Sequence, residues 1–314
     1  MKKIVYVTGC LGFIGSAVTR HCLERGWYVI GVDKGTYAST WDFLDEFQGY
    51  PTFKFIHSDI NDLDRLLDCD YVINTAAETH VDNSIESSDE FVHSNIDGVH
   101  HLLKLITQKQ SFRMPTLLHF STDEVYGDIE EGFHTEKDLL KPSNPYSATK
   151  AAADMLILAW ARTHKIPYVI VRPTNNYGIG QYVEKLIPKA VKYLNIGRQV
   201  DLHQNGTPVR TWLHVDDTAR AVLSVIDSGV KNDIFNISGN YEEQNIVVIK
   251  KIIECVHGNV TDIEPYIRHM TRPGQDVRYA IDDTKLKSLG WTPQAVFDDE
   301  LAKIVNYYTQ HFVW

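Results

Sequence analysis

Two acidic residues and a hydroxyl group directly follow an apolar run, TLLHF, at positions 116–120. They are Thr122, Asp123 and Glu124. If the run is a strand of a parallel sheet, the residues just past its end face the ligand crevice. Burial and mutual repulsion would keep one carboxyl group protonated and the other ionised, which supplies an acid and a base. Such a pair suits β-elimination of water beside a ketone. The alternative is that both acids are solvated or stabilise the start of a helix.

Tyr146 and Lys150 are four residues apart in NPYSATK, so they lie on one face of a predicted helix. Asn144 is the predicted N-cap, and Pro145 occupies the first helical position. An ammonium group beside a phenol favours the phenolate, so we expect a lowered pKa and a basic role for Tyr146. The alternative is an incidental Tyr and Lys on an exposed helix.

A glycine loop, VTGCLGFIG, places Gly9, Gly12 and Gly15 after the first predicted strand and at the start of a helix. Glycines here permit a tight turn and close approach to a pyrophosphate, although an ordinary turn is the alternative. Asp33, at the end of the second predicted strand, can bind both hydroxyls of an adenosine ribose. This acid would repel the 2′-phosphate of NADP, so NAD is the predicted cofactor. Lys34, next in the chain, is the one feature in favour of NADP.

Short apolar runs alternate with amphipathic segments in the first half of the chain. Strands are predicted at 4–7, 28–32, 53–56, 71–74, 116–120 and 168–172, and helices at 14–25, 89–107 and 146–164. This alternation predicts an α/β fold with a doubly wound parallel sheet, that is, a Rossmann domain. We expect that domain to span 1–172 with a return segment at about 211–236. A smaller C-terminal α/β lobe would comprise 173–210 and 237–314.

Composition narrows the functional classes. The 314 residues carry a formal net charge of −10, which argues against nucleic-acid binding. No apolar run is long enough to span a membrane. Four scattered cysteines form no C-x-x-C pair, which is typical of a reduced, cytoplasmic protein. Fourteen histidines contain no H-E-x-x-H pattern, so no metal site is predicted.

The motifs STDEVYGD, NPYSATK, AAETHVDNS, NNYG, EKLIP and RPGQDVRYAID resemble those of the nucleotide-sugar 4,6-dehydratases. These are extended short-chain dehydrogenase/reductase enzymes, and dTDP-glucose 4,6-dehydratase is their best-known representative. The resemblance runs from VTGCLGFIG to LGWTP. Sugar 4-epimerases and UDP-glucuronate decarboxylases are the alternatives within this superfamily. Neither usually carries an acid at the position of Asp123.

The resemblance implies a role for each catalytic residue. Tyr146 would take the O4 proton of the hexose as hydride passes from C4 to NAD⁺, while Thr122 hydrogen-bonds O4. Lys150 would tune Tyr146 and hold the nicotinamide ribose. Glu124 would then remove the C5 proton and Asp123 would protonate the departing C6 hydroxyl. Return of the hydride to C6 would leave a 4-keto-6-deoxy sugar.

The resemblance and the motifs also imply the binding residues and a homodimer formed through the helices at 89–107 and 146–164. The expected cofactor contacts are Gly9, Gly12, Phe13, Ile14, Gly15, Asp33, Lys34, Asp59, Ile60, Ala76, Ala77, Tyr146, Lys150 and Asn176. The expected contacts of a nucleoside-diphosphate hexose are Thr79, Thr122, Asn175, Lys185, Leu186, Arg210, Asn236, Arg272 and Gln275. Asn83, Thr211 and Gln275 replace the usual Arg, Asp and His near the nucleotide. The base (dTDP, UDP or another) and the hexose therefore stay open.

Overall fold

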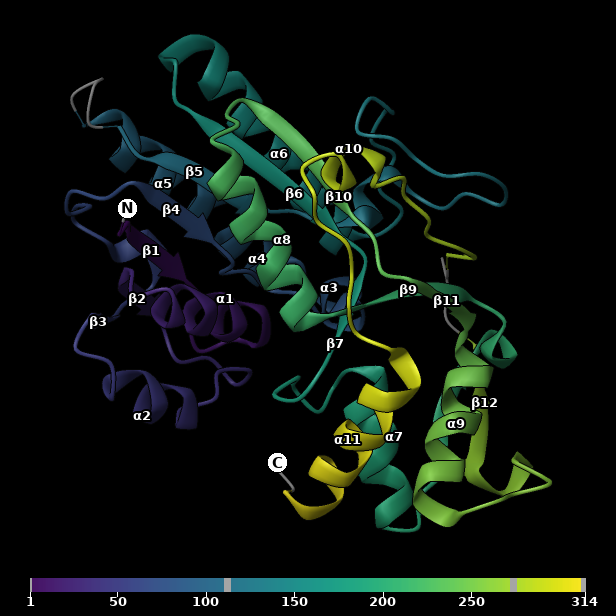
Figure 1. Ribbon diagram of the computed structural model, residues 1–314. Helices are drawn as coiled ribbons and strands as arrows, with labels where there is room; N and C mark the ends of the chain where they lie inside the picture. The colour runs from purple at the N-terminus through teal and green to yellow at the C-terminus, as the bar shows by residue number, and fades with distance from the viewer. Residues whose placement is uncertain (1, 110–113, 272–275, 312–314) are drawn as a thin grey trace.

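A seven-stranded parallel sheet forms the centre of the larger part of the protein. The computed structural model describes residues 2–109, 114–271 and 276–311 (Figure 1). The strand order is β10-β6-β5-β4-β1-β2-β3. The strands are β1 (Ile4–Thr8), β2 (Tyr28–Asp33), β3 (Phe53–His57), β4 (Tyr71–Asn74), β5 (Thr116–Phe120), β6 (Tyr168–Pro173) and β10 (Asp233–Ile237). The order reverses between β1 and β4, which is the crevice where doubly wound sheets bind ligands. The predicted fold class is confirmed.

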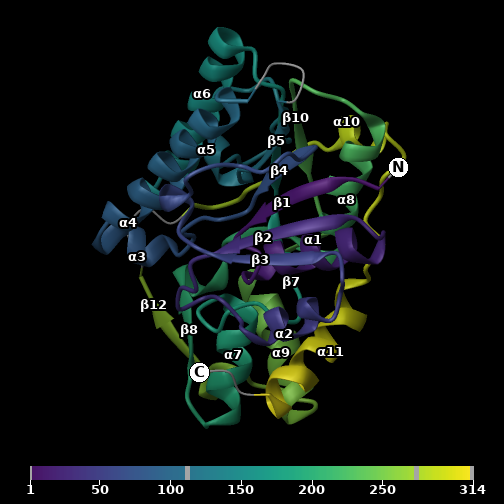
Figure 2. The same cartoon turned by 90° about the vertical axis from the view of Figure 1, so that its left-hand side faces the viewer.

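Helices cover both faces of this sheet, and the two cores follow the alternation of side chains along each strand. Val5 and Val7 of β1 face α1 (Phe13–Glu24) and α8 (Val215–Ser228). Tyr6, between them, faces α5 (Gly98–Thr107) and α6 (Pro145–His164) on the opposite side. Figure 2 shows the two groups of helices on either side of the strands. Both faces are buried, so the strands are apolar throughout.

The predicted helix at 89–107 is divided into three parts in the structure. It consists of α4 (Asp89–Val92), a π-helical turn (His93–Asp97) and α5. The π turn contains Asn95, whose amide donates to the Thr149 hydroxyl of α6 at 3.0 Å and to the backbone carbonyl of Glu78 at 3.0 Å. A π turn is a local insertion in a helix, which a 3.6-residue periodicity does not reveal. It anchors the loop after β4 to the helix that carries Tyr146.

The smaller lobe has its own sheets and core. A three-stranded sheet, β11-β9-β7, and a two-stranded sheet, β12-β8, lie beside three helices (Figure 1). The elements are β7 (Asn175–Tyr177), β8 (Val200–His203), β9 (Val209–His214), β11 (Tyr241–Gln244), β12 (Ile267–Met270), α7 (Leu186–Asn195), α9 (Asn245–His257) and α11 (Phe297–Gln310). The remaining short helices are α2 (Asp42–Gln48), α3 (Val81–Glu86) and α10 (Thr284–Lys287). Strand β10 is at the edge of the large sheet, and α8 packs against that sheet. Leu286 and Trp291 also pack in the core of that sheet, so we propose that the segment around α10 belongs to the Rossmann domain.

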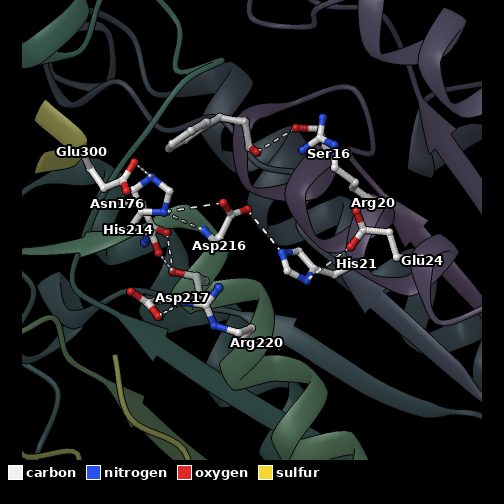
Figure 3. A network of polar contacts seen from close by, with 12 residues as sticks. Ser16, Arg20, His21, Glu24, Asn176, His214, Asp216, Asp217, Arg220 and Glu300 are labelled. Carbon is white, nitrogen blue, oxygen red and sulfur yellow. Dashed lines mark hydrogen bonds and ion pairs between the residues drawn. The ribbon is translucent and has the colours of Figure 1, made fainter. Parts of the chain in front are cut away.

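A polar network around Asp216 and His214 joins the two lobes (Figure 3). His214, at the end of β9, has Nδ1 3.7 Å from Asp216 Oδ2 and Nε2 3.8 Å from Glu300 Oε2. Asp216 also lies 3.3 Å from the imidazole of His21 in α1. The network therefore connects two helices of the large sheet, α1 and α8, with α11 of the smaller lobe.

Asp216→Asn is expected to lower the free energy of unfolding by about 0.2–1 kcal/mol at pH 7, a modest loss because Asp216 is partly exposed. The hydrogen bond from His21 lowers the pKa of Asp216. A lowered carboxyl pKa contributes stability above the ordinary pKa of 3.8, and this stability is lost as the pH falls below it. Urea unfolding at pH 7 measures the effect. Asp227→Asn, which removes the more exposed ion pair with Arg25, is the control and should have a smaller effect.

Candidate active site

The glycine loop packs so tightly that two of its three positions exclude a side chain. Gly9 has a φ of 71°, in the left-handed region, and a Cβ there would lie 2.8 Å from the Ala76 nitrogen. A Cβ at Gly15 would collide with the carbonyl of Gly9 and lie 2.6 Å from Thr75 Oγ1. Gly12, the N-cap of α1, has no side chain to bond the first amides of the helix. These N–H groups therefore face the crevice and can bind an anion.

A cavity of about 100 Å³ opens beside this loop and is lined by Asp33, Lys34 and Asp59. The Asp33 carboxylate is oriented by the Leu11 N–H at 2.9 Å and the Ser39 hydroxyl at 2.8 Å. Lys34 Nζ lies 3.3 Å from Asp59 Oδ2, so its charge is balanced within the protein. Lys34 therefore adds little attraction for a 2′-phosphate. The other predicted residues that line this cavity are Gly9, Gly12, Ile60, Ala76 and Ala77.

The central cavity, about 260 Å³, contains four of the predicted catalytic residues. Thr122, Asp123, Glu124 and Tyr146 line it together with Gly9, Gly12, Phe13, Ile14, Gly15, Ala77, Thr79, Asn175, Asn176 and Lys185. The acids begin a 3₁₀ turn, Asp123–Tyr126, capped by Thr122, whose Oγ1 accepts from the Glu124 N–H at 3.3 Å. The acids thus start a helical turn and also face the cavity. The helix-start alternative therefore describes the structure, and it is compatible with two acids that face a ligand.

Asp123 and Glu124 differ in their surroundings. Burial and then the charge of Glu124 raise the pKa of Asp123 to about 7. Burial also raises the pKa of Glu124, but the charge of Arg210 and a hydrogen bond from Asn144 oppose this shift. Asp123 Oδ2 is buried and has no hydrogen-bond partner among the residues that the structure describes. Asp123 therefore has the properties of an acid that can hold a proton near neutral pH.

Tyr146 and Lys150 are both buried on α6. Burial lowers the pKa of Lys150 to about 8, although the charge of Asp154 opposes this. The pKa of Tyr146 is raised, first by burial and then by the charge of Glu124, while a hydrogen bond from Thr122 acts in the opposite direction. The prediction of a lowered Tyr146 pKa is wrong for the protein alone, because burial and the charge of Glu124 raise it.

An outer cavity of about 250 Å³ continues from the central one and shares Glu124 with it. The predicted residues Thr79, Asn175, Lys185, Leu186 and Arg210 line this outer cavity. Lys185 Nζ donates to the Thr79 carbonyl at 3.0 Å, and the Arg210 guanidinium lies 4.6 Å from the ring centre of Tyr279. Two cations in one cavity can bind a diphosphate. The predicted contacts Arg272 and Gln275 lie outside the described residues.

One predicted substrate contact needs correction. Asn236, on β10, is fully buried, and its Oδ1 accepts from the Tyr126 hydroxyl at 2.9 Å. Its Nδ2 donates to the carbonyls of His134 and Asp282. The Asn236 amide therefore connects β10 to the segments that contain Tyr126, His134 and Asp282. Its oxygen and its NH₂ group are both hydrogen-bonded inside the protein. We therefore replace the predicted substrate contact with a structural role.

The sequence analysis missed several residues of the outer cavity. Asn144, Asp201, His203, Asn245 and Tyr279 line it. Tyr279 lies within the motif RPGQDVRYAID, which could have identified it. Asn245 follows β11 at the start of α9, and the chain offers no local signal for its role.

Asn176, a predicted cofactor contact, lines the central cavity, where its Oδ1 accepts from the Thr218 hydroxyl at 2.5 Å (Figure 3).

Across residues 2–109, 114–271 and 276–311, no group of three His, Cys, Asp or Glu side chains is arranged to bind a metal. Within the same residues, no helix is long and apolar enough to cross a membrane.

Comparison with known proteins identifies the family. Residues 5–238 match the NAD dependent epimerase/dehydratase family. The chain belongs to this family. The match covers the whole large sheet and both elements, α8 and β10, that return to it.

Individual relatives match over nearly the whole chain. Low-salt glycan biosynthesis protein Agl12 of Haloferax volcanii is 40% identical, with 97% of this chain and 98% of that protein covered. The dTDP-glucose 4,6-dehydratase of Escherichia coli is 37% identical, with 99% and 94% covered. The crystal structure of DesIV, a dTDP-glucose 4,6-dehydratase from Streptomyces venezuelae with NAD bound, has a TM-score of 0.92 at 35% identity, with 98% and 97% covered. The predicted resemblance to nucleotide-sugar 4,6-dehydratases is confirmed.

Proposed function

We propose that this chain is an NAD-dependent nucleoside-diphosphate-hexose 4,6-dehydratase that acts on dTDP-glucose or UDP-glucose. The observation that carries the proposal is the shared central cavity of Thr122, Asp123, Glu124 and Tyr146. It lies between the glycine loop and the cations Lys185 and Arg210. The relatives that bear this enzyme's name, with NAD in the DesIV crystal structure, support both the enzyme class and the cofactor.

The residues of the crevice fit a dinucleotide. Gly9 and Gly15 leave no room for side chains where the backbone must approach a pyrophosphate. Asp33, oriented by backbone and hydroxyl donors, provides acceptor oxygens for a ribose. When bound, NAD supplies a reversible hydride acceptor. The chain's own residues then supply the proton transfers.

Tyr146 accepts the proton of the hexose O4, and Thr122 donates a hydrogen bond that favours the phenolate. Lys150, one helical turn away on α6, is the buried cation on the same helix. This deprotonation accompanies oxidation of C4 to a ketone. The ketone acidifies the hydrogen on C5.

Glu124 then takes the C5 proton, and Asp123 gives its own proton to the C6 hydroxyl. The C5–H and C6–O bonds break, a C5–C6 double bond forms and water leaves. Asp123 is suited to this step because its raised pKa, about 7, lets it arrive protonated. Reduction at C6 and protonation at C5 complete the 4-keto-6-deoxy sugar, with no net oxidation.

Two other functions predict different products. The reaction of a 4-epimerase or decarboxylase does not require a buried acid at position 123. A non-catalytic NAD-binding protein requires none of the four residues of the central cavity named above. Purified protein should be incubated with dTDP-glucose, UDP-glucose and other nucleoside-diphosphate hexoses. A product lighter by one water supports dehydration. An isobaric product would indicate epimerisation, loss of carbon dioxide from UDP-glucuronate would indicate decarboxylation, and no product would favour the binding protein.

Gly15→Ala is expected to weaken NAD binding by about tenfold or more, because the added methyl group collides with the Gly9 carbonyl and displaces α1 from the loop. Titration of cofactor-free protein with NAD by calorimetry measures the affinity. Gly132→Ala is the control: a Cβ there meets nothing within 4 Å, so this variant adds only the backbone strain of a φ of 79° and no collision. Equal affinity in the Gly15 variant and the wild type would contradict the proposed pyrophosphate site.

We further propose a cytoplasmic homodimer formed through α5 and α6, which lie next to each other on one side of the sheet (Figure 2). Met155 on α6 is 49% exposed and Val92 on α4 is 40% exposed, so this side presents apolar side chains. The four cysteines are free thiols, which fits a reducing compartment. Light scattering at micromolar concentration should report a dimer, and Met155→Glu should shift it toward monomer. A monomeric wild type would contradict the proposal.

A further inference from the structure

We propose that Asn144 is a positioning residue for the dehydration step, because it holds and orients the carboxylate of Glu124. This inference rests on the proposed function. The two ends of one side-chain amide make different contacts. Asn144 Oδ1 accepts from the Ser147 backbone N–H at 2.9 Å, and Asn144 Nδ2 lies 3.3 Å from Glu124 Oε2.

The orientation of the Asn144 amide follows from hydrogen-bond chemistry. A backbone N–H can only donate, so the atom that faces Ser147 must be the amide oxygen. The Ser147 hydroxyl completes the capping box, with Oγ 3.3 Å from the Asn144 backbone nitrogen. With the oxygen committed to the start of α6, the NH₂ group is the end that faces Glu124.

The residue type at position 144 is explained by Glu124 and not by capping. Asn, Asp and Ser are nearly equivalent as N-caps. Asp at this position would place a second negative charge beside Glu124, and Ser would provide the cap without a second donor. Asn supplies both an acceptor for the helix and a donor for the carboxylate. Helix capping alone therefore does not explain the NH₂ group of Asn144.

Several groups act on Glu124 from the elements around it. The charged and titratable groups are Arg210 on β9, Lys185 at the start of α7, Asp123 beside it, Asp276, and the phenols Tyr146 and Tyr279. Burial raises the pKa of Glu124, and the Asn144 hydrogen bond helps to keep the carboxylate ionised. Because Oε2 accepts this bond, Oε1 is the oxygen better placed to take the C5 proton.

Asn144 also connects the two reaction steps in space. It is the N-cap of the helix that carries Tyr146 two residues later. The residue that fixes the start of α6 thus also fixes the carboxylate that acts after Tyr146. A shift of the start of α6 would therefore also move the Glu124 carboxylate. Asn144 thus fixes the positions of Tyr146, which acts at C4, and Glu124, which acts at C5, relative to each other.

Asn144→Ser and Asn144→Asp test this role, with dTDP-glucose as substrate and the holoenzyme as the protein. Both variants keep an N-cap, so the helix should form. We expect exchange of the C5 hydrogen with deuterium from solvent to slow about 10- to 100-fold in Asn144→Ser, and by more in Asn144→Asp. The acidic limb of the profile, where exchange rises as Glu124 loses its proton, should move to higher pH in both variants. Reduction of bound NAD⁺, followed by absorbance in a single turnover, should change less than about threefold.

Ser147→Ala is the matched control, because it breaks the capping box but leaves the bond between Asn144 Nδ2 and Glu124. It should lower the melting temperature without shifting the pH profile of C5 exchange. Wild-type exchange rates and pH profile in both Asn144 variants would overturn the inference and leave the proposed function intact. Equal slowing of exchange and of NAD⁺ reduction would also overturn it, since that result means general damage to α6. A wild-type protein that forms no keto sugar would overturn both.

Discussion

Glu124→Gln is expected to abolish exchange of the C5 hydrogen with solvent while leaving hydride transfer from C4 intact. The glutamine amide keeps the size of the side chain and its place in the central cavity, but it cannot accept a proton near neutral pH. The expected loss is about 10²–10⁴-fold in elimination, the range for removal of a general base. Hydride transfer depends on Tyr146 and Thr122. The substitution removes the Glu124 charge, which is one cause of the raised Tyr146 pKa, so C4 oxidation should not slow.

The measurement for Glu124→Gln follows two signals in one single-turnover experiment. Absorbance of reduced NAD reports C4 oxidation, and mass spectrometry in deuterated water reports C5 exchange. We expect reduced NAD to accumulate with the 4-keto hexose, since water is not lost. Glu130→Gln, in the exposed loop that follows, is the control and should behave as wild type. Unimpaired exchange in Glu124→Gln would remove Glu124 from its role as base.

Asp123→Asn is expected to slow loss of water by about 10²–10⁴-fold, because an amide cannot protonate a departing hydroxyl. The pH dependence gives a second signature. The acid works only while it holds its proton, and its pKa is about 7. Wild-type elimination should therefore decline as the pH rises through 7, whereas the residual rate of Asp123→Asn should lack this limb. C5 exchange should persist in the variant, since Glu124 remains.

Stability offers an independent test of Asp123. Its pKa in the folded protein is raised from 3.8 to about 7, so the folded state binds the proton more tightly than the unfolded state. The stability contributed by this group is complete below pH 4 and is lost as the pH rises through 7. Asp123→Asn should not show this loss. The difference in denaturant midpoint between Asp123→Asn and wild type should therefore shift in favour of the variant from pH 5 to pH 8. Asp128→Asn, an exposed acid nearby, is the control. An identical pH dependence in wild type and Asp123→Asn would mean that Asp123 is not a buried acid.

Much of the fold could be predicted because its signals are local. Strand β5 is a five-residue apolar run, and α6 begins with an N-cap and a proline that the sequence displays. The glycine loop could also be predicted from residues close together in the chain. Gly9 adopts a positive φ that residues with a side chain disfavour, so the glycine itself is the signal. The three-part helix at 89–107 was not predicted, because a single π turn leaves the apolar pattern almost unchanged.

The sequence alone predicted the parallel sheet and the glycine loop with Asp33, and it named Thr122, Asp123, Glu124, Tyr146 and Lys150 as the catalytic candidates. It did so because turn residues, apolar periodicity and strand ends are properties of short segments. The tertiary structure was needed to show that Asn236 makes its hydrogen bonds inside the protein and that Asn144 reaches Glu124. It also reversed the expected shift of the Tyr146 pKa. Those outcomes depend on desolvation and on contacts between groups far apart in the chain, which no local pattern encodes.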